Sequence, residues 1–179
     1  PWTLGQESKR LLRCVYDFKL LSRRNRFQGN PAECAFPGGV RFFPPECTTN
    51  LQKIKIISKD YGLSVNSNAD DILPLDGELN LIKAAVNRLS PNKGFDLIIE
   101  CDAPPGTGLG SSGTVAVLVI GLILEYMEKH ASPYRIAEMA YKIEVEDLKI
   151  IVGRQDQYAA TFGGFNLIED SADTTLVTP

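Results

Sequence analysis

The sequence is poor in the residues that metal clusters and disulfide frameworks need. Its four cysteines (Cys14, Cys34, Cys47 and Cys101) show no CxxC spacing, and His130 is the only histidine. This composition argues against a zinc or iron–sulfur cluster. Cys101 lies in a strand-like run and is interpreted as a buried thiol, which suits a reducing compartment. His130 falls in a loop at the end of a predicted helix, and we assign it no role.

Long apolar runs are also missing. The longest, residues 115–124, is about half of the roughly 20 residues that a membrane span needs. The N-terminus lacks the apolar stretch followed by small residues that marks a signal peptide. We therefore expect a cytoplasmic protein that makes no membrane contact.

An overall excess of basic residues is absent as well. The net charge is −3, with 44% apolar and 23% charged residues, which is ordinary for a soluble domain and argues against nucleic acid as the partner. The charge is uneven, because residues 1–30 carry seven Lys or Arg and two acids, which leaves −8 on the remainder. Residues 8–27 could form a basic amphipathic helix. It could contact nucleic acid or a membrane surface, but we favour an extension with a solvated basic face.

What is present, from residue 52 onward, is a mixture of predicted strands and helices. Residues 29–48 are dense in Gly and Pro and are predicted to be irregular. Ile54 and Ile56 alternate with lysines in a half-buried strand, and Leu63 and Val65 continue the sheet after a turn at residues 60–62. The mixture predicts an α/β or α+β fold.

Further along the chain, the pattern predicts helices with recognisable starts. Asp76 is predicted to cap a helix that Pro91 and Gly94 end. A strand through Leu97, Ile99 and Cys101 follows. The remaining predicted elements are a buried helix at residues 111–128, a helix that starts at Ser132–Pro133 and ends near Asp147, a short helix at residues 155–161, and a strand at residues 165–168.

A Gly/Pro-rich loop at residues 104–110 lies between the strand and the buried helix, and reads PPGTGLGSSG through residue 113. Glycines allow the backbone to approach a phosphate closely. The first-turn N–H groups of the helix and its dipole favour an anion there. Ser111 and Ser112 add hydroxyl groups for a phosphate oxygen or a metal ion. The loop lacks the Lys of a Walker A motif and the βαβ repeat of a dinucleotide site.

This string resembles the second motif of the GHMP kinases, the family of galactokinase, homoserine kinase and mevalonate kinase, whose usual form is PxGxGLGSSA. Gly113 stands in place of the usual Ala. The resemblance implies an α+β, two-layer N-terminal domain related to the second domain of ribosomal protein S5. It also implies ATP and Mg²⁺ as cofactors. The implied nucleotide-binding residues are Pro105, Gly106, Gly108, Leu109, Gly110, Ser111, Ser112 and Gly113.

A second string, GRQDQYAATFGGFN at residues 153–166, is similar to the GKQDQYAAAFGG segment of the D-glycero-D-manno-heptose 7-phosphate kinases, with Arg154 in place of the usual Lys. The resemblance extends over residues 51–170. It implies that Ser112 and Glu144 bind Mg²⁺ and that Asp156 is the catalytic carboxylate, which orients and deprotonates the acceptor hydroxyl. Glu146 is the alternative to Glu144 as a metal ligand.

The resemblance also predicts a division of the chain. Residues 1–30 lie outside the resemblance and are an unassigned basic extension. Residues 31–179 correspond to the N-terminal, ATP-binding domain, with residues 31–50 a degenerate form of the sugar-contacting first motif. The C-terminal domain of the family, which carries its own glycine-rich motif, is expected to be absent after Pro179, so that the chain is a truncated kinase.

The resulting functional hypothesis is an ATP-dependent kinase of a sugar phosphate, with D-glycero-D-manno-heptose 7-phosphate as the expected acceptor. Other acceptors of the family, namely fucose, galactose or mevalonate, are the first alternative. A catalytically dead nucleotide-binding fragment is the second, because the first motif is altered. A purely structural role ranks last, since it leaves the Ser-containing loop and the acids unexplained. The sequence predicts no oligomeric state.

Overall fold

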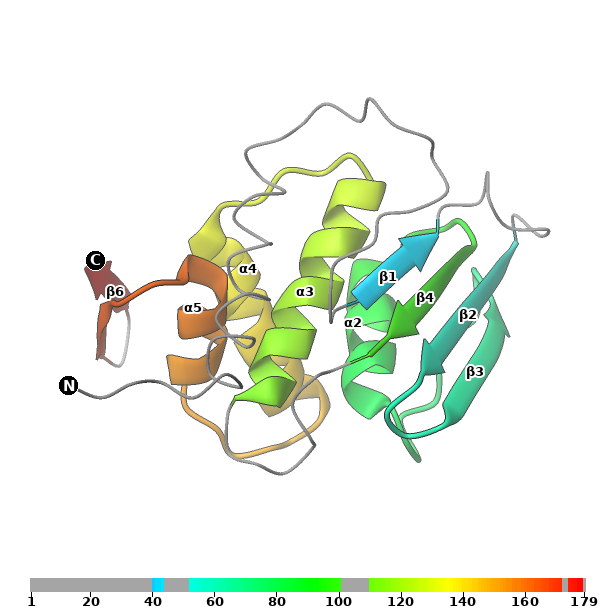
Figure 1. The fold of residues 1–179 in the computed structure, drawn as a ribbon, viewed down its shortest axis with the longest axis horizontal. Helices are drawn as coiled ribbons and strands as arrows, with labels where there is room; N and C mark the ends of the chain where they lie inside the picture. The colour runs from blue at the N-terminus through cyan, green and yellow to red at the C-terminus, as the bar shows by residue number, and fades with distance from the viewer. Residues whose placement is uncertain (1–39, 44–51, 101–109, 172–173, 179) are drawn as a thin grey trace.

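The computed structural model describes residues 40–43, 52–100, 110–171 and 174–178. A four-stranded sheet and a group of helices form its main body, and a short β-hairpin lies at the opposite end from the sheet (Figure 1). In chain order the elements are β1 (Val40–Phe43), β2 (Lys53–Ser58), β3 (Leu63–Asn68), α2 (Asn80–Leu89), β4 (Phe95–Ile99), α3 (Ser111–Tyr126), α4 (Pro133–Lys142), a π-helical turn η2 (Ile143–Asp147), α5 (Gln155–Phe162), β5 (Leu167–Asp170) and β6 (Thr175–Thr178).

The sheet has the strand order β1-β4-β2-β3 and mixed pairing. Strands β2 and β3 form an antiparallel hairpin, β4 runs parallel to β2, and β1 runs antiparallel to β4. Along β2, Ile54, Ile56 and Ser58 are buried while Lys53 and Lys55 are exposed. The helices therefore cover one face of this sheet, because side chains alternate between the two faces of a strand.

The core lies between the covered face of the sheet and helices α2 and α3. Phe95 and Leu97 of β4 are fully buried, and Phe95 meets Tyr126 of α3 edge to face with 6.0 Å between the ring centroids. Helix α3 starts at Ser111, as predicted, and residues 115–124 are all buried or half-buried. The predicted strand and the buried helix that follows it are therefore confirmed, and the fold is α+β.

Two predictions on local structure are wrong. Residues 29–48 are not wholly irregular, because Val40–Phe43 form β1 at the edge of the sheet. An edge strand tolerates the prolines that follow it, since only one of its sides is paired. Asp76 does not cap α2, which begins four residues later at Asn80. The Asn80 side chain bonds back to the Gly77 N–H (3.4 Å) and the Leu75 carbonyl (3.2 Å), and this turn sets the helix start.

The remaining helices follow the predicted pattern more closely. The Ser132 side chain caps α4 by accepting a hydrogen bond from the Arg135 backbone N–H, with Pro133 in the first turn. The helix continues to Asp147 as predicted, although its last five residues widen into the π-helical turn η2. Helix α5 spans the predicted residues and one more.

The hairpin of β5 and β6 packs on α4 and α5 through a second, smaller core. Ala137, Tyr158 and Val177 are its buried members, and Phe162 and Ile168 pack against them. The predicted strand at residues 165–168 begins two residues later, at Leu167, and its partner β6 is not predicted by the sequence. The position of α5 is therefore fixed from both sides, by α3 and by this hairpin.

Several predictions concern residues that the structure leaves undescribed. The basic segment 1–30, Cys101, and the loop residues Pro105, Gly106, Gly108 and Leu109 lie outside the described residues. Within the residues that are described, none of the helices combines the length and apolar character that crossing a bilayer would require.

Candidate active site

The start of α3 is built around Gly110. This residue has φ 70°, in the left-handed region that favours glycine, and it precedes the first helical residue, Ser111. The N–H of Thr114 bonds to the Gly110 carbonyl (3.0 Å), and the Thr114 hydroxyl reaches the same oxygen (3.0 Å). Ser112 is exposed on the first turn. The first turn of α3 therefore offers free N–H groups, a hydroxyl and the positive end of a helix dipole.

The start of α5 packs directly against the start of α3. A Cβ atom on Gly110 would lie 3.3 Å from Oδ2 of Asp156, and a Cβ on Gly113 would lie 3.0 Å from Cβ of Asp156. The two glycines thus leave the space in which Asp156, an exposed residue of the first turn of α5, is placed. The structure brings Asp156 together with two of the predicted nucleotide-binding residues, Gly110 and Gly113.

Glu144 reaches the same place from η2. Its side chain is only 2% exposed, accepts a hydrogen bond from the Gln157 side-chain amide, and is hydrogen-bonded to Ser112. Burial raises the pKa of Glu144 above its ordinary value of 4.5. The hydrogen bonds from Gln157 and Ser112 oppose this rise, and the nearby charge of Asp156 adds to it. The charged form of this carboxylate is therefore costly in the chain alone.

No positive side chain compensates Glu144 among the described residues, because none of their ion pairs includes it. A buried carboxylate without a cationic partner favours a bound cation beside it. The described residues also hold no group of three or more His, Cys, Asp or Glu that could bind a metal ion by itself. Mg²⁺ fits this arrangement, since it commonly takes one or two protein oxygen ligands and completes its shell with phosphates and water.

The alternative ligand, Glu146, faces a different part of the molecule. Arg88 of α2 donates to Oε2 of Glu146 (2.9 Å) and to both oxygens of Asp147 (2.7 Å each). This pairing ties the end of α2 to η2. Among the acids of this turn, Glu144 is therefore the one that contacts Ser112.

Gln157 is a site residue that sequence reasoning missed. It is 1% exposed, and its Oε1 has no hydrogen-bond partner among the described residues. One signal could have identified it. The buried side of α5 consists of Gln157, Tyr158, Ala160 and Thr161, and a buried polar side chain such as Gln157 requires a hydrogen-bond partner. The identity of that partner depends on the contact between η2 and α5, which the sequence does not reveal.

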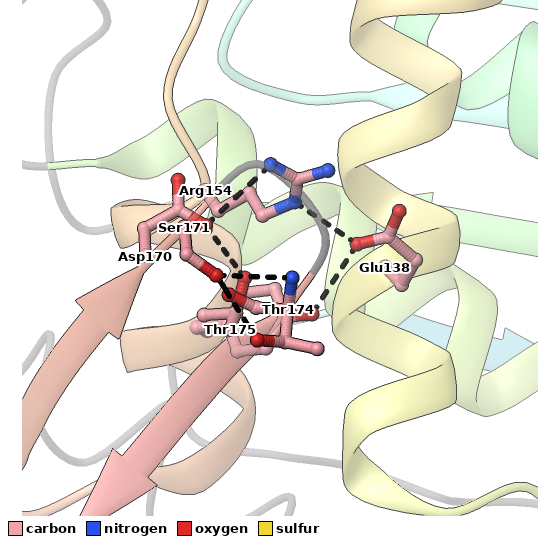
Figure 2. A network of polar contacts seen from close by, with 7 residues as sticks. Glu138, Arg154, Asp170, Ser171, Thr174 and Thr175 are labelled. Carbon is pink, nitrogen blue, oxygen red and sulfur yellow. Dashed lines mark hydrogen bonds and ion pairs between the residues drawn. The ribbon is translucent and has the colours of Figure 1, made fainter.

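A polar network holds α5 from its other side (Figure 2). Arg154, at the start of α5, donates from Nε to Oε2 of Glu138 on α4 (3.2 Å) and from Nη1 to Oδ1 of Asp170 on β5 (3.5 Å). Its guanidinium carbon lies 4.2 Å from the ring centroid of Tyr141. The hydroxyl of Thr175 on β6 donates to the same oxygen of Asp170 (2.7 Å). The network links the hairpin, α4 and the turn that carries Asp156.

The chain is similar to known proteins over much of its length. Residues 80–164 match the GHMP kinases N terminal domain family. The chain is 41% identical over 122 residues to D-glycero-alpha-D-manno-heptose 7-phosphate kinase of Campylobacter jejuni, which covers 65% of this chain and 36% of that protein. It is 30% identical over 122 residues to galactokinase of Lactococcus lactis subsp. cremoris, covering 62% of this chain and 30% of that enzyme.

Among solved structures, a D-glycero-D-manno-heptose 1-phosphate kinase from Bacteroides thetaiotaomicron superposes with a TM-score of 0.68 at 36% identity. The superposition covers 73% of this chain and 45% of that one. The chain therefore spans less than half the length of each of these relatives.

Proposed function

Because this chain belongs to the GHMP kinase family, we propose that it is the nucleotide-binding part of an ATP-dependent sugar kinase. Residues 31–179 would form its N-terminal domain, with residues 31–50 as a degenerate first motif. The observation that carries the proposal is the convergence of Ser112, Glu144 and Asp156, which come from three separate elements, at the adjoining starts of α3 and α5.

The start of α3 would bind the phosphates of ATP. Gly110, Ser111, Ser112 and Gly113 provide backbone N–H groups and hydroxyls there, and the loop residues Pro105, Gly106, Gly108 and Leu109 would complete the cradle. Ser112 and Glu144 would hold Mg²⁺, with Glu144 in its ionised form. When bound, the ion neutralises charge on the phosphate oxygens during transfer.

Asp156 would act on the acceptor. Its carboxylate would accept a hydrogen bond from the acceptor hydroxyl and take its proton as the hydroxyl oxygen bonds to the γ-phosphorus. The bond between that phosphorus and the β–γ bridging oxygen then breaks, and ADP leaves with the electron pair. The exposed position of Asp156 at a helix start suits this role, because the carboxylate is reachable by a substrate and is held by the backbone around it.

The proposed acceptor is the anomeric hydroxyl of D-glycero-D-manno-heptose 7-phosphate. Support comes from the GRQDQYAATFGG string and from the 41% identity to the Campylobacter enzyme that bears this substrate in its name. Galactose and mevalonate are the acceptors that other relatives' names suggest. We expect the 179-residue chain alone to show very little kinase activity, because the altered residues 31–50 leave the sugar-contacting motif incomplete.

The experiment is an exchange of segments. The stretch of the Campylobacter enzyme that matches this chain is replaced by the corresponding 122 residues, and ADP release is followed with the heptose phosphate, galactose and mevalonate in parallel. The proposal predicts heptose-dependent ADP release by the chimera. Release with galactose or mevalonate alone would overturn the acceptor assignment. A folded chimera that binds no nucleotide would overturn the proposed function itself.

A further inference from the structure

Gln157 lies at the inner end of a row of polar side chains that runs from the surface into the core. Ser112 is exposed, Glu144 behind it is 2% exposed, and Gln157 is 1% exposed. The Gln157 Nε2 donates to Oε2 of Glu144. The carboxylate is therefore held between a surface hydroxyl on one side and a buried amide on the other.

The orientation of this amide is fixed by its partner. An ionised carboxylate accepts hydrogen bonds but donates none, so Nε2 must face Glu144 and Oε1 must point elsewhere. Oε1 then has no partner among the described residues. A buried polar atom that is left unpaired destabilises the folded state, because it has lost its hydrogen bonds to water. An apolar residue of similar size would avoid this cost. We therefore attribute the presence of an amide at this position to its hydrogen bond with Glu144.

The backbone of Gln157 is also restrained. Its carbonyl accepts a hydrogen bond from the Thr161 hydroxyl (2.7 Å), and its N atom would lie 3.3 Å from a Cβ on Gly113. The side chain consequently starts from a well-defined point between α3 and η2. Since Asp156 is its neighbour on α5, one helical turn presents Asp156 outward and Gln157 inward.

We propose that Gln157 is a positioning residue for the Glu144 carboxylate. It holds Oε2 from the buried side, so that the other oxygen and the Ser112 hydroxyl are left to hold the divalent cation of the bound nucleotide. This inference rests on the proposed function. It assigns Gln157 no contact with the nucleotide or the acceptor. Removing the amide should therefore weaken binding of the metal ion and leave nucleotide binding without metal unchanged.

The test uses Mn²⁺ as the probe, with the 179-residue chain and an ATP analogue whose β–γ bridge resists cleavage. Free Mn²⁺ is counted by electron paramagnetic resonance, and analogue binding without metal is measured by calorimetry. Gln157→Met removes the amide at similar length, and Gln155→Met, an exposed neighbour on α5, is the matched control. We expect Gln157→Met to weaken Mn²⁺ binding about tenfold, in the range found for residues that orient metal ligands. The control should bind like the wild type.

The outcomes separate this inference from the proposed function. If the wild type binds no Mn²⁺–nucleotide, or if Glu144→Gln binds it unchanged, the proposed function fails and the inference fails with it. If Glu144→Gln weakens Mn²⁺ binding while Gln157→Met matches the control, the inference alone is overturned. A thermal melt checks that Gln157→Met is folded. If Gln157→Met does not fold, the inference is tested with Gln157→Asn, which keeps the amide but is one methylene shorter. This variant must then show the same loss of Mn²⁺ binding.

Discussion

Gly113 of α3 and Asp156 of α5 are in closer contact than a side chain at position 113 would allow. A Cβ on Gly113 would lie 3.0 Å from Cβ of Asp156, 3.3 Å from its carbonyl carbon and 3.3 Å from the Gln157 backbone nitrogen. Two of these three neighbours are backbone atoms, which cannot swing away as a flexible side-chain end can. The glycine therefore sets how closely the two helix starts approach.

Gly113→Ala should lower stability, although alanine is the better helix former. Overpacking costs typically 1–3 kcal/mol, whereas the gain from Gly→Ala is about 0.4–1 kcal/mol, so we expect a net loss of about 1 kcal/mol in urea unfolding. Gly153→Ala is the matched control, because a Cβ there meets nothing within 4 Å. It should be neutral or slightly stabilising. A more stable Gly113→Ala protein would show that the two helices separate at little cost.

The pH dependence of stability should carry the signature of Glu144. Its pKa is raised in the folded chain, so between its ordinary value of 4.5 and the raised value the folded state binds more protons than the unfolded state. In metal-free solution this group therefore contributes stability at low pH that is lost as pH rises through the folded pKa. Glu144→Gln should remove that fall and be the more stable protein near neutral pH.

The measurement is urea unfolding of both proteins at a series of pH values, with a chelator present. Other carboxyl groups titrate in the same range, so the difference between wild type and variant is the quantity that counts. Glu125→Gln, on an exposed position of α3, is the control for losing one acidic charge. Parallel pH profiles for the wild type and Glu144→Gln would contradict the burial of an uncompensated carboxylate.

Ser112→Ala should weaken ATP binding only when Mg²⁺ is present. Losing a charge-assisted contact costs roughly 1–3 kcal/mol, which is about 5- to 150-fold in affinity. The fold should not suffer, because alanine is a good helix former in the first turn of α3. Calorimetry with and without Mg²⁺ measures the effect, and Ser64→Ala on the exposed side of β3 is the control. A loss of affinity that is equal with and without Mg²⁺, or an unchanged variant, would count against the role of Ser112.

Arg154→Lys should loosen the attachment of the β5–β6 hairpin. The guanidinium contacts Glu138 and Asp170 while it lies over Tyr141, and a lysine ammonium cannot make all three contacts at once. The partners are partly exposed, so we expect a loss of only about 1 kcal/mol, smaller at high salt. Arg135→Lys, at an exposed position of α4, is the control. Equal unfolding midpoints for the two variants would refute a structural role of this network.

The sequence predicted the elements whose signals are local. The run of glycines before Ser111 and the apolar residues after it identify a buried helix, and Ser132–Pro133 identifies the start of α4. Strand β1 escaped prediction because its four residues lie among glycines and prolines and are organised by pairing with β4, some 55 residues away. The start of α2 was misplaced because the side chain of Asn80, rather than Asp76, organises the preceding turn.

The residues of the candidate site were predicted through motif resemblance. The contacts that bury Glu144 and Gln157 behind the surface were not predicted. Nothing local distinguishes Glu144 from Glu146, since both lie in the same acidic turn. They differ in their contacts with distant elements. Arg88 forms an ion pair with Glu146, whereas Ser112 and Gln157 form hydrogen bonds with Glu144. The close approach of Gly113 to Asp156 likewise arises only when α3 and α5 are packed.

The role of Asp156 can be measured most directly in the segment-exchange chimera. ADP release with D-glycero-D-manno-heptose 7-phosphate is compared for the chimera and its Asp156→Asn variant, with ATP affinity determined on both. The variant should bind ATP normally and lose about 10²- to 10⁴-fold in turnover, as expected when a general base is removed. An Asn variant that turns over like its parent would contradict the assignment of Asp156 as the carboxylate that activates the acceptor.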